Sequence, residues 1–481
     1  MRKKKMSRTK KIDSNKERKK LLVFWKSIRL PILAFLTAFL AGAILIIFTD
    51  LSIYALFNTA VNHLTVGRGI LAIIGIATIP ASFWIGNLNF IQGFLKKNVL
   101  NIWSISIRGT IVVFGVILAI FLLNLAGFSA VLSTALEISY TAYHSLFAGS
   151  IGNFSEIVDA FQSGNIDQIT EAINPLSESL VAATPYIFGA LSVAIALRCG
   201  IFNIGTEGQL YIGALASTIV GIYLKGLPAF VHIFLALLAG GLAGAFWAGI
   251  PAILKTRFGS NEVINTIMLN YVAFKFVEFM LIGPIHRPDQ PEPFSAYILP
   301  SAELPRFLPY PNRFHLGFFI AIGLAVFMYW FLFKTPTGLE IRLVGKNPNA
   351  AKYAGINIKN KYILAFLISG AMAGLAGANE ILGVNHYLSG TISPGYGFES
   401  ISLSILGNNH PIGVIFTSLM FGFLRNGSTR MQNIARVPIE IITIMQALII
   451  SFIAAPTIIQ KLFRLKDDDK ERIVVTRGWG K

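Results

Sequence analysis

Twelve apolar stretches, each followed by a more polar segment, constrain this 481-residue chain more than any other feature. A helix needs about 20 apolar residues to cross the hydrocarbon core of a bilayer, where its backbone must satisfy its own hydrogen bonds. The pattern predicts an all-α, polytopic integral membrane protein with about twelve transmembrane helices in a lipid bilayer. Two stretches near the C-terminal end are short. The stretches cover roughly residues 30–48, 69–88, 108–126, 177–197, 208–224, 227–249, 262–284, 316–333, 361–382, 396–407, 411–425 and 437–458.

The composition excludes most other classes of protein. Apolar residues make up 54% of the chain, charged residues 13%, and the mean hydropathy is +0.64, which nearly excludes a soluble multidomain enzyme. The net charge is +18. In a chain this apolar, such an excess indicates cytoplasmic loops, so nucleic acid is not expected as a partner. The single cysteine, Cys199, cannot form an internal disulfide.

The distribution of basic residues predicts the orientation. If the N-terminus is inside and the spans alternate, interior segments hold 32 of the 41 Lys and Arg residues. This bias predicts a multi-pass protein of the cell (plasma) membrane with both termini cytoplasmic. It begins with a polybasic segment (1–29) before an uncleaved first span, and ends in a tail (461–481). Outer loops are then expected at about 127–176, which is acidic, and 285–315, which is rich in proline. Arg425, Arg430 and Arg436 fall outside and are exceptions to the bias.

The sequence lacks the common signatures of catalysis. No G-x-x-x-x-G-K-[ST] string is present, so the chain is not expected to hydrolyse a nucleotide through a P-loop. The seven histidines and one cysteine show no metal-ligand spacing, and there is no G-x-S-x-G elbow. We therefore expect no enzyme activity, no catalytic residue, no metal and no cofactor bound by this chain.

A glycine-rich polar string joins two apolar stretches at residues 198–209. It reads Arg198-Cys-Gly-Ile-Phe-Asn-Ile-Gly-Thr-Glu-Gly-Gln209 and leaves no room for a separate loop. Asn203, Glu207 and Gln209 are candidates for a substrate pathway, because polar groups at membrane depth mark pathways by default. The alternative for Glu207 is that it caps the helix that follows, where an acid suits the positive end of the helix dipole.

Other polar residues lie in or beside apolar stretches. Asn270, Glu380 and Glu399 complete the predicted pathway, because hydrogen-bonding groups suit a neutral, polar solute. Glu278 lies three residues after Lys275, which indicates a local structural ion pair. Two runs of small residues, Gly240–Gly244 and Gly370–Gly374, predict surfaces where helices pack closely.

The interior segment 334–361 contains a short predicted helix. Asn347-Pro-Asn is typical of a helix start, Ala350 to Ala354 suit a helix, and Gly355 suits its end. A short helix of small residues between two spans would fit a cleft on a soluble partner. The alternative is a plain surface loop whose lysines reach the lipid headgroups. The residues assigned to docking are Gly345, Asn347, Ala350, Ala351 and Gly355.

Four strings together resemble the permease subunits of ATP-binding-cassette importers. The resemblance is to the branched-chain amino acid and simple sugar group, most closely its nucleoside-uptake branch, and it covers about residues 135–460. The strings are Gly200 to Gln209; Leu254 to Val263 with Ile267 to Tyr271; Val344 to Ile356; and Gly395 to Ile401 with Gly407 to Pro411.

The resemblance implies a transport subunit with a permease core (135–460) of ten helices and a coupling helix near 345–356. Residues 30–134 would then hold a first family-like span and an inserted helix pair. It also implies partners: a second, different permease subunit, an ATP-binding-cassette ATPase that uses ATP, an extracellular substrate-binding lipoprotein, and a nucleoside as substrate. This chain has Glu399 where the family usually has Asp.

Three alternatives stay open from the sequence. The first is a ribose or other simple sugar permease, or a branched-chain amino acid permease. The second is an ion-coupled secondary transporter that acts alone through its intramembrane carboxylates. The third is a membrane-embedded structural or receptor subunit.

Overall fold

The computed structural model describes residue 33, residues 36–85 and residues 114–454 of the chain. The polybasic segment 1–29, the interior segment 89–108 and the tail 461–481 lie outside this part. Within it, regular secondary structure consists of helices, with only isolated β-bridges besides. The all-α prediction is confirmed for the described residues.

The predicted count of twelve transmembrane helices is not confirmed. Six helices in the described part are long and apolar enough to cross a bilayer, or seven if the bent pair Leu36–Thr49 and Leu51–Asn62 is one span. The other predicted stretches that the structure describes are also helical, but they are shorter or carry polar residues at one end. For example, α9 (Thr206–Tyr223) opens with Thr206, Glu207 and Gln209.

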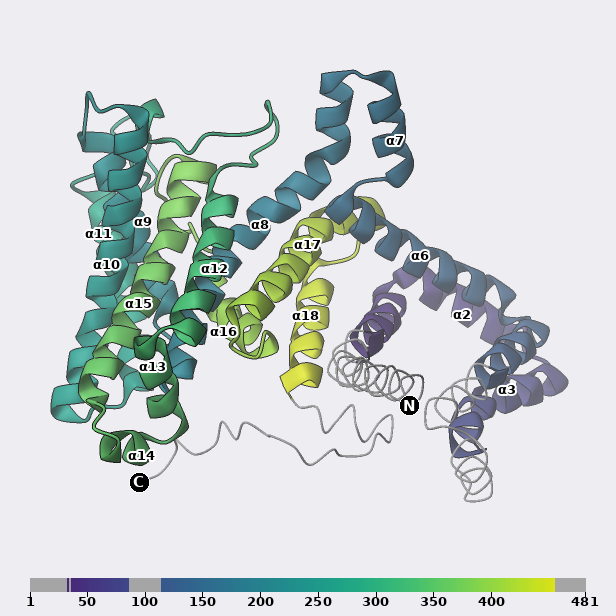
Figure 1. Cartoon of the computed structure of the whole chain (residues 1–481). Helices are drawn as coiled ribbons and strands as arrows, with labels where there is room; N and C mark the ends of the chain where they lie inside the picture. Colours follow the sequence, from purple (N-terminus) through teal and green to yellow (C-terminus); the bar gives the residue numbers. More distant parts are fainter. Residues whose placement is uncertain (1–32, 34–35, 86–113, 455–481) are drawn as a thin grey trace, which may run out of the picture. The chain divides into compact units, whose positions relative to one another are not determined.

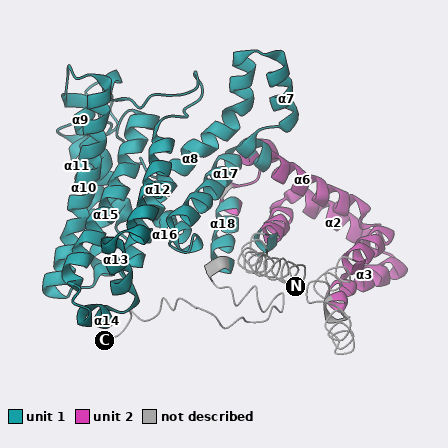
Figure 2. Cartoon of the chain, viewed as in Figure 1, with its two compact units in different colours: residues 1–38, 146–430, 442–481 teal, residues 39–145, 431–441 magenta. Residues whose placement is uncertain are grey.

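The chain divides into two compact units (Figure 2). Unit 2, residues 39–145 and 431–441, contains α2 (Leu51–Asn62), α3 (Val66–Ile85) and most of α6 (Ser129–Ile151). Asp50 caps α2 by accepting a hydrogen bond from the Ser52 amide, which favours the 71° bend between the two helices there. A helix from Phe114 reaches α6 through a π-helical turn, Asn124–Phe128, in which Gly127 has a φ of 100°.

The segment 127–176, predicted to be an outer loop, is helical. These residues form α6, α7 (Phe154–Ser163) and the first turns of α8 (Ile166–Arg198). Asn165 starts α8 by accepting from the Asp167 amide, and Gly164 ends α7 with a φ of 66°. Residues 127–163 belong to one of the six long apolar helices, which begins at Phe114.

Unit 1, which includes residues 146–430, holds the remaining helices (Figure 1). They are α7, α8, α9, α10 (Ala229–Phe258), α11 (Glu262–Ile282), α12 (Gly317–Lys334), α13 (Pro336–Lys346), α14 (Pro348–Tyr353), α15 (Ile358–Asn379) with a π-helical extension (Glu380–Asn385), α16 (Tyr396–Leu406), most of α17 (Pro411–Ala435), and most of α18 (Ile439–Ala454).

Small residues let α9, α10 and α15 pack backbone against backbone. A Cβ added at Gly374 of α15 would lie 2.2 Å from the Gly240 carbonyl oxygen of α10, and one at Gly244 would lie 2.3 Å from that of Gly370. Gly213 of α9 meets Gly374 equally closely. The two predicted small-residue surfaces therefore pack on each other, and nothing larger than glycine fits at these crossings.

The connections of unit 1 gather at two opposite ends, as an alternating arrangement requires. At one end Arg198 contacts Asn408 and Asn409, and the Cys199 thiol lies beside the Lys361 carbonyl. These residues belong to the segments predicted to be interior. At the other end, backbone hydrogen bonds join the loop 285–315 to residues 386–388 and to Gly221.

Candidate functional site

Residues 201–205 run through unit 1 without regular structure, and nearby side chains satisfy their backbone. The Asn270 side chain accepts from the Gly208 amide (2.9 Å) and donates to the Ile204 carbonyl (3.0 Å). The Thr266 hydroxyl accepts from the Ile204 amide. Irregular backbone at membrane depth is tolerated only where its polar groups find partners. Asn270 is therefore engaged in holding this string.

Asn203 and Gln209 form a reciprocal amide pair. Asn203 Nδ2 donates to Gln209 Oε1 (3.1 Å), and Gln209 Nε2 donates to Asn203 Oδ1 (3.2 Å). Asn203 also donates to the Ser369 hydroxyl of α15, which meets Ser192 of α8 at 2.9 Å. All four side chains are buried. Three of the six predicted pathway residues thus hold helices together.

Glu207 lies in the first turn of α9, and its carboxylate also caps a second helix. Its Oε2 accepts from the Gly397 amide at 2.5 Å, in the first turn of α16. A Cβ at Gly397 would lie 2.4 Å from the Glu207 nitrogen, so only glycine allows α16 to start this close to α9. The carboxylate supplies negative charge at the positive end of α16.

A second group of polar residues is made of charged and aromatic side chains from α8, α16 and α17. We call Tyr186, Tyr396, Glu399 and Arg425 the Glu399 cluster. The Tyr186 hydroxyl donates to Glu399 and accepts from Arg425 Nη1 at 3.0 Å. Arg425 lies 3.7 Å from Glu399 Oε2 and 5.4 Å from the Tyr396 ring centre. The Glu399 and Arg425 side chains are 30% and 33% exposed, so this pair is accessible.

Glu380 lies one residue beyond α15 and is only 5% exposed. Among the described residues, its carboxylate has no hydrogen-bond or ion-pair partner, and Arg313 and Arg425 are the cations that act on it. The neighbouring Asn379 Nδ2 is buried without a partner as well. A buried carboxylate and a buried amide donor without partners can accept hydrogen bonds from, and donate them to, a bound polar molecule.

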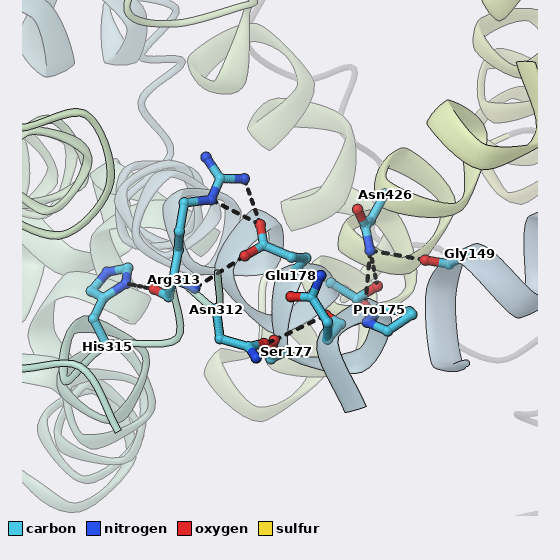
Figure 3. A network of polar contacts seen from close by, with 10 residues as sticks. Gly149, Pro175, Ser177, Glu178, Asn312, Arg313, His315 and Asn426 are labelled. Atoms are coloured by element: carbon cyan, nitrogen blue, oxygen red, sulfur yellow. Dashed lines mark hydrogen bonds and ion pairs between the residues drawn. The ribbon is translucent and has the colours of Figure 1, made fainter. Parts of the chain in front are cut away.

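A network of polar contacts fixes the loop 285–315 to α8 (Figure 3). Glu178 accepts from the Arg313 amide (3.1 Å) and Nε (3.0 Å), and this pairing raises the pKa of Arg313. The Asn312 side chain donates to the Thr170 carbonyl. His315 contacts the Arg313 carbonyl and Asn379, and burial lowers the pKa of its imidazole. The loop is thus anchored beside Glu380.

Sequence reasoning missed most of these groups. Tyr186, Tyr396, Arg313 and Glu178 carry no local signal, because their partners lie far away along the chain. Arg425 did carry one, since an arginine that ends an apolar stretch is expensive in a bilayer and is expected to have a partner. Within the described residues, no group of three or more His, Cys, Asp or Glu side chains could hold a metal ion.

The predicted docking helix forms where the sequence places it. Asn347 Oδ1 accepts from the Ala350 amide, Pro348 is the first helical residue, and Gly355 follows the helix with a φ of 82°. The helix before it, α13, was missed, although Thr335 caps it and Pro336 begins it.

The five residues assigned to docking divide between two environments. Ala351 is 3% exposed, and a Cβ at Gly345 would lie 2.1 Å from the Arg198 carbonyl oxygen, so both face this chain itself. Asn347, Ala350 and Gly355 are exposed. Tyr353, which the sequence did not single out, is 94% exposed on the same short helix.

Comparisons with known proteins identify the fold's relatives. A family described as "Branched-chain amino acid transport system / permease component" matches residues 176–454. The guanosine ABC transporter permease protein NupP of Bacillus subtilis (strain 168) is 39% identical over 58% of this chain and 81% of its own length. A glucose ABC transporter permease protein of Haloferax volcanii is 36% identical, over 62% of this chain and 80% of its own.

A third relative, the nucleoside ABC transporter permease protein NupB of Lactococcus lactis subsp. cremoris, is 36% identical over 59% of this chain and 80% of its own length. No solved structure matches the chain. The family match covers more than half of the sequence and includes both groups of polar residues described above. The chain therefore belongs to the permease family of branched-chain amino acid transport systems, the membrane subunits of ABC transporters.

Proposed function

We propose that this chain is the permease subunit of an ATP-driven importer that carries nucleosides across the cell membrane. Relatives named for guanosine and nucleoside transport support the substrate class. A relative named for glucose makes sugar transport the second candidate. This chain would bind no cofactor, because ATP is used by a partner ATPase.

The observation that carries the proposal is the Glu399 cluster with Glu380 nearby. The Tyr396 ring, which is half-buried, could stack on a planar base, whereas the Tyr186 ring is fully buried. Carboxylate and guanidinium groups can hydrogen-bond to the edge of a base or to ribose hydroxyls. Among the six predicted pathway residues, Glu399 and Glu380 therefore remain candidates for direct contact with substrate. Asn203, Glu207, Gln209 and Asn270 would shape the pathway by holding its walls.

The partners follow from the same proposal. A second, different permease subunit would complete the membrane part, an extracellular lipoprotein would deliver substrate, and the ATPase would bind at the predicted cytoplasmic end, where both termini would also lie. The docking surface would consist of Asn347, Ala350, Tyr353 and Gly355, because these are exposed. Gly345 and Ala351 would instead fix the helix to its own chain.

Transport by the reconstituted complex tests the function. The complete complex in liposomes should import labelled uridine or guanosine only with ATP and the binding protein, and excess glucose or ribose should not compete. Import of glucose or ribose but not of nucleosides would favour the second candidate. Nucleoside uptake by this chain alone would indicate an ion-coupled secondary transporter. If no combination of subunits transports any of these solutes, the chain is a structural or receptor subunit.

ATPase association tests the docking surface separately. Ala350→Trp should weaken co-purification of the ATPase by at least about tenfold, since a large side chain on the exposed face blocks a close fit. Lys359→Trp is the control, because residue 359 is also exposed but lies at the start of α15. Equal association of both variants would contradict the assignment.

A further inference from the structure

Arg198, the last residue of α8, holds the turn between α16 and α17. Its Nε donates to the Asn409 carbonyl and its Nη2 to the Asn408 carbonyl, both at 2.9 Å. Asn408 and Asn409 have φ values of 55° and 51°, a left-handed conformation that Asn tolerates better than most residues. The two-asparagine turn therefore aims two successive carbonyls at one guanidinium.

The backbone of Arg198 meets the segment that carries the docking helix. Gly345, near the end of α13, lies so close that a Cβ there would be 2.1 Å from the Arg198 carbonyl oxygen. Gly200, with a φ of 78°, faces the same glycine: a Cβ on Gly200 would be 3.1 Å from the Gly345 Cα. Only one residue separates Gly345 from Asn347, the cap of α14.

No carboxylate pairs with Arg198 among the described residues. Its guanidinium instead lies 5.5 Å from the centre of the Phe333 ring of α12, which Arg342 of α13 also approaches at 4.9 Å. A forked guanidinium can bind two carbonyls and an aromatic face together, whereas a lysine ammonium acts as a single point of charge. The contact depends on the shape of arginine as well as its charge.

The three helices joined through Arg198 are those that carry the Glu399 cluster. Tyr186 lies on α8, Tyr396 and Glu399 on α16, and Arg425 on α17. Arg198 is twelve residues from Tyr186 on the same helix, about 18 Å along its axis. Arg198 thus connects the end of α8 and the turn between α16 and α17 to the segment that contains the docking helix.

We propose that Arg198 is a positioning residue that transmits movement of the α13–α14 segment to the turn between α16 and α17, and so couples ATP hydrolysis to the Glu399 cluster. This inference rests on the proposed function. It assigns a role to the two-asparagine turn, which the pathway and docking assignments leave without one. Removing the hydrogen bonds of Arg198 should uncouple ATP hydrolysis from nucleoside transport while the subunits of the complex stay associated.

The test is the number of nucleosides imported per ATP hydrolysed by the complete complex in liposomes. Arg198→Lys and Arg198→Ala should each lower this ratio by about tenfold, because neither side chain can hold both carbonyls. ATPase association, binding-protein-stimulated ATP hydrolysis and the KM for substrate should stay within about twofold of the unmodified complex. Arg257→Ala is the control, since Arg257 is an exposed arginine at the end of α10.

The outcomes separate this inference from the proposed function. If the unmodified complex fails to import nucleosides, the proposed function is wrong. If it imports them and Arg198→Lys keeps the full ratio, a positive charge suffices and the inference is overturned. A loss of ATPase association equal to the loss of transport would also overturn it, because Arg198 would then support assembly.

Discussion

The glycine-rich string at residues 201–209 and the Glu399 cluster both place polar groups inside unit 1, but the two groups differ in their exposure and in their hydrogen-bond partners. In the string, the Asn203, Gln209 and Asn270 side chains are about 1% exposed, and each hydrogen-bonds to another side chain or to the backbone. In the cluster, Glu399 and Arg425 are about one-third exposed and 3.7 Å apart. Polar groups in a membrane protein can thus either stabilise the walls of a pathway or contact the solute. Polar groups that stabilise the walls are recognised by being buried and fully hydrogen-bonded.

The largest expected effect, on stability, comes from removing the hydrogen bonds that hold the glycine-rich string at residues 201–209. Asn270→Leu would leave the buried Gly208 amide and Ile204 carbonyl without partners, at about 1–3 kcal/mol each. We expect a clearly lower melting temperature in detergent and little folded protein in the membrane. The neighbouring Tyr271→Leu is the control, because Tyr271 is 62% exposed. Equal stability of the two variants would mean that Asn270 does not hold the string.

A second substitution should affect transport without affecting folding. Glu399→Gln keeps the size of the side chain but removes the charge that faces Arg425, so nucleoside uptake should fall by about tenfold or more while the melting temperature changes little. Arg425→Gln should behave alike, and the double variant should lose less than the two single losses combined, because the residues act as a pair. Additive losses would show that the pair does not function together.

The smallest effect is expected at Glu207, an acid that belongs to the string. Glu207→Gln can still accept from the Gly397 amide, but it loses the charge at the start of α16, which costs about 1 kcal/mol. Uptake per folded complex should remain within about twofold of the unmodified protein. A larger loss of uptake with normal stability would show that Glu207 contacts the substrate and does not only stabilise the wall of the pathway.

The sequence allowed prediction of features that depend on local or periodic signals. The start of α14 at Asn347-Pro348, its end before Gly355 and the small-residue surfaces of α10 and α15 all follow from neighbouring residue types. The helices between 129 and 163 were missed because their acidic residues, with no Lys or Arg among them, were interpreted as a mark of an outer loop. α13 was missed although Thr335 and Pro336 mark its start.

The site could be predicted only in part, because its partners are distant in sequence. Glu399 and Glu380 were found as acids near apolar stretches, but Tyr186 lies 213 residues from Glu399 and 239 from Arg425. Glu207 was predicted as a pathway residue, with a role at the start of its own helix as the alternative; it lies in the first turn of α9, and its carboxylate also accepts from the Gly397 amide of α16, 190 residues away. Residue type and local spacing identify polar groups at membrane depth, whereas their pairing depends on how the helices pack.

The most direct measurement compares Glu399→Gln with Glu207→Gln in the complete reconstituted complex. The two substitutions are chemically identical, and Glu207 bonds to a residue only two positions from Glu399. Initial uptake of labelled uridine or guanosine, divided by the amount of folded complex, should fall by about tenfold or more for Glu399→Gln and stay nearly unchanged for Glu207→Gln. Full uptake by Glu399→Gln together with loss of uptake by Glu207→Gln would contradict the assignment of Glu399 to substrate contact and of Glu207 to the wall of the pathway.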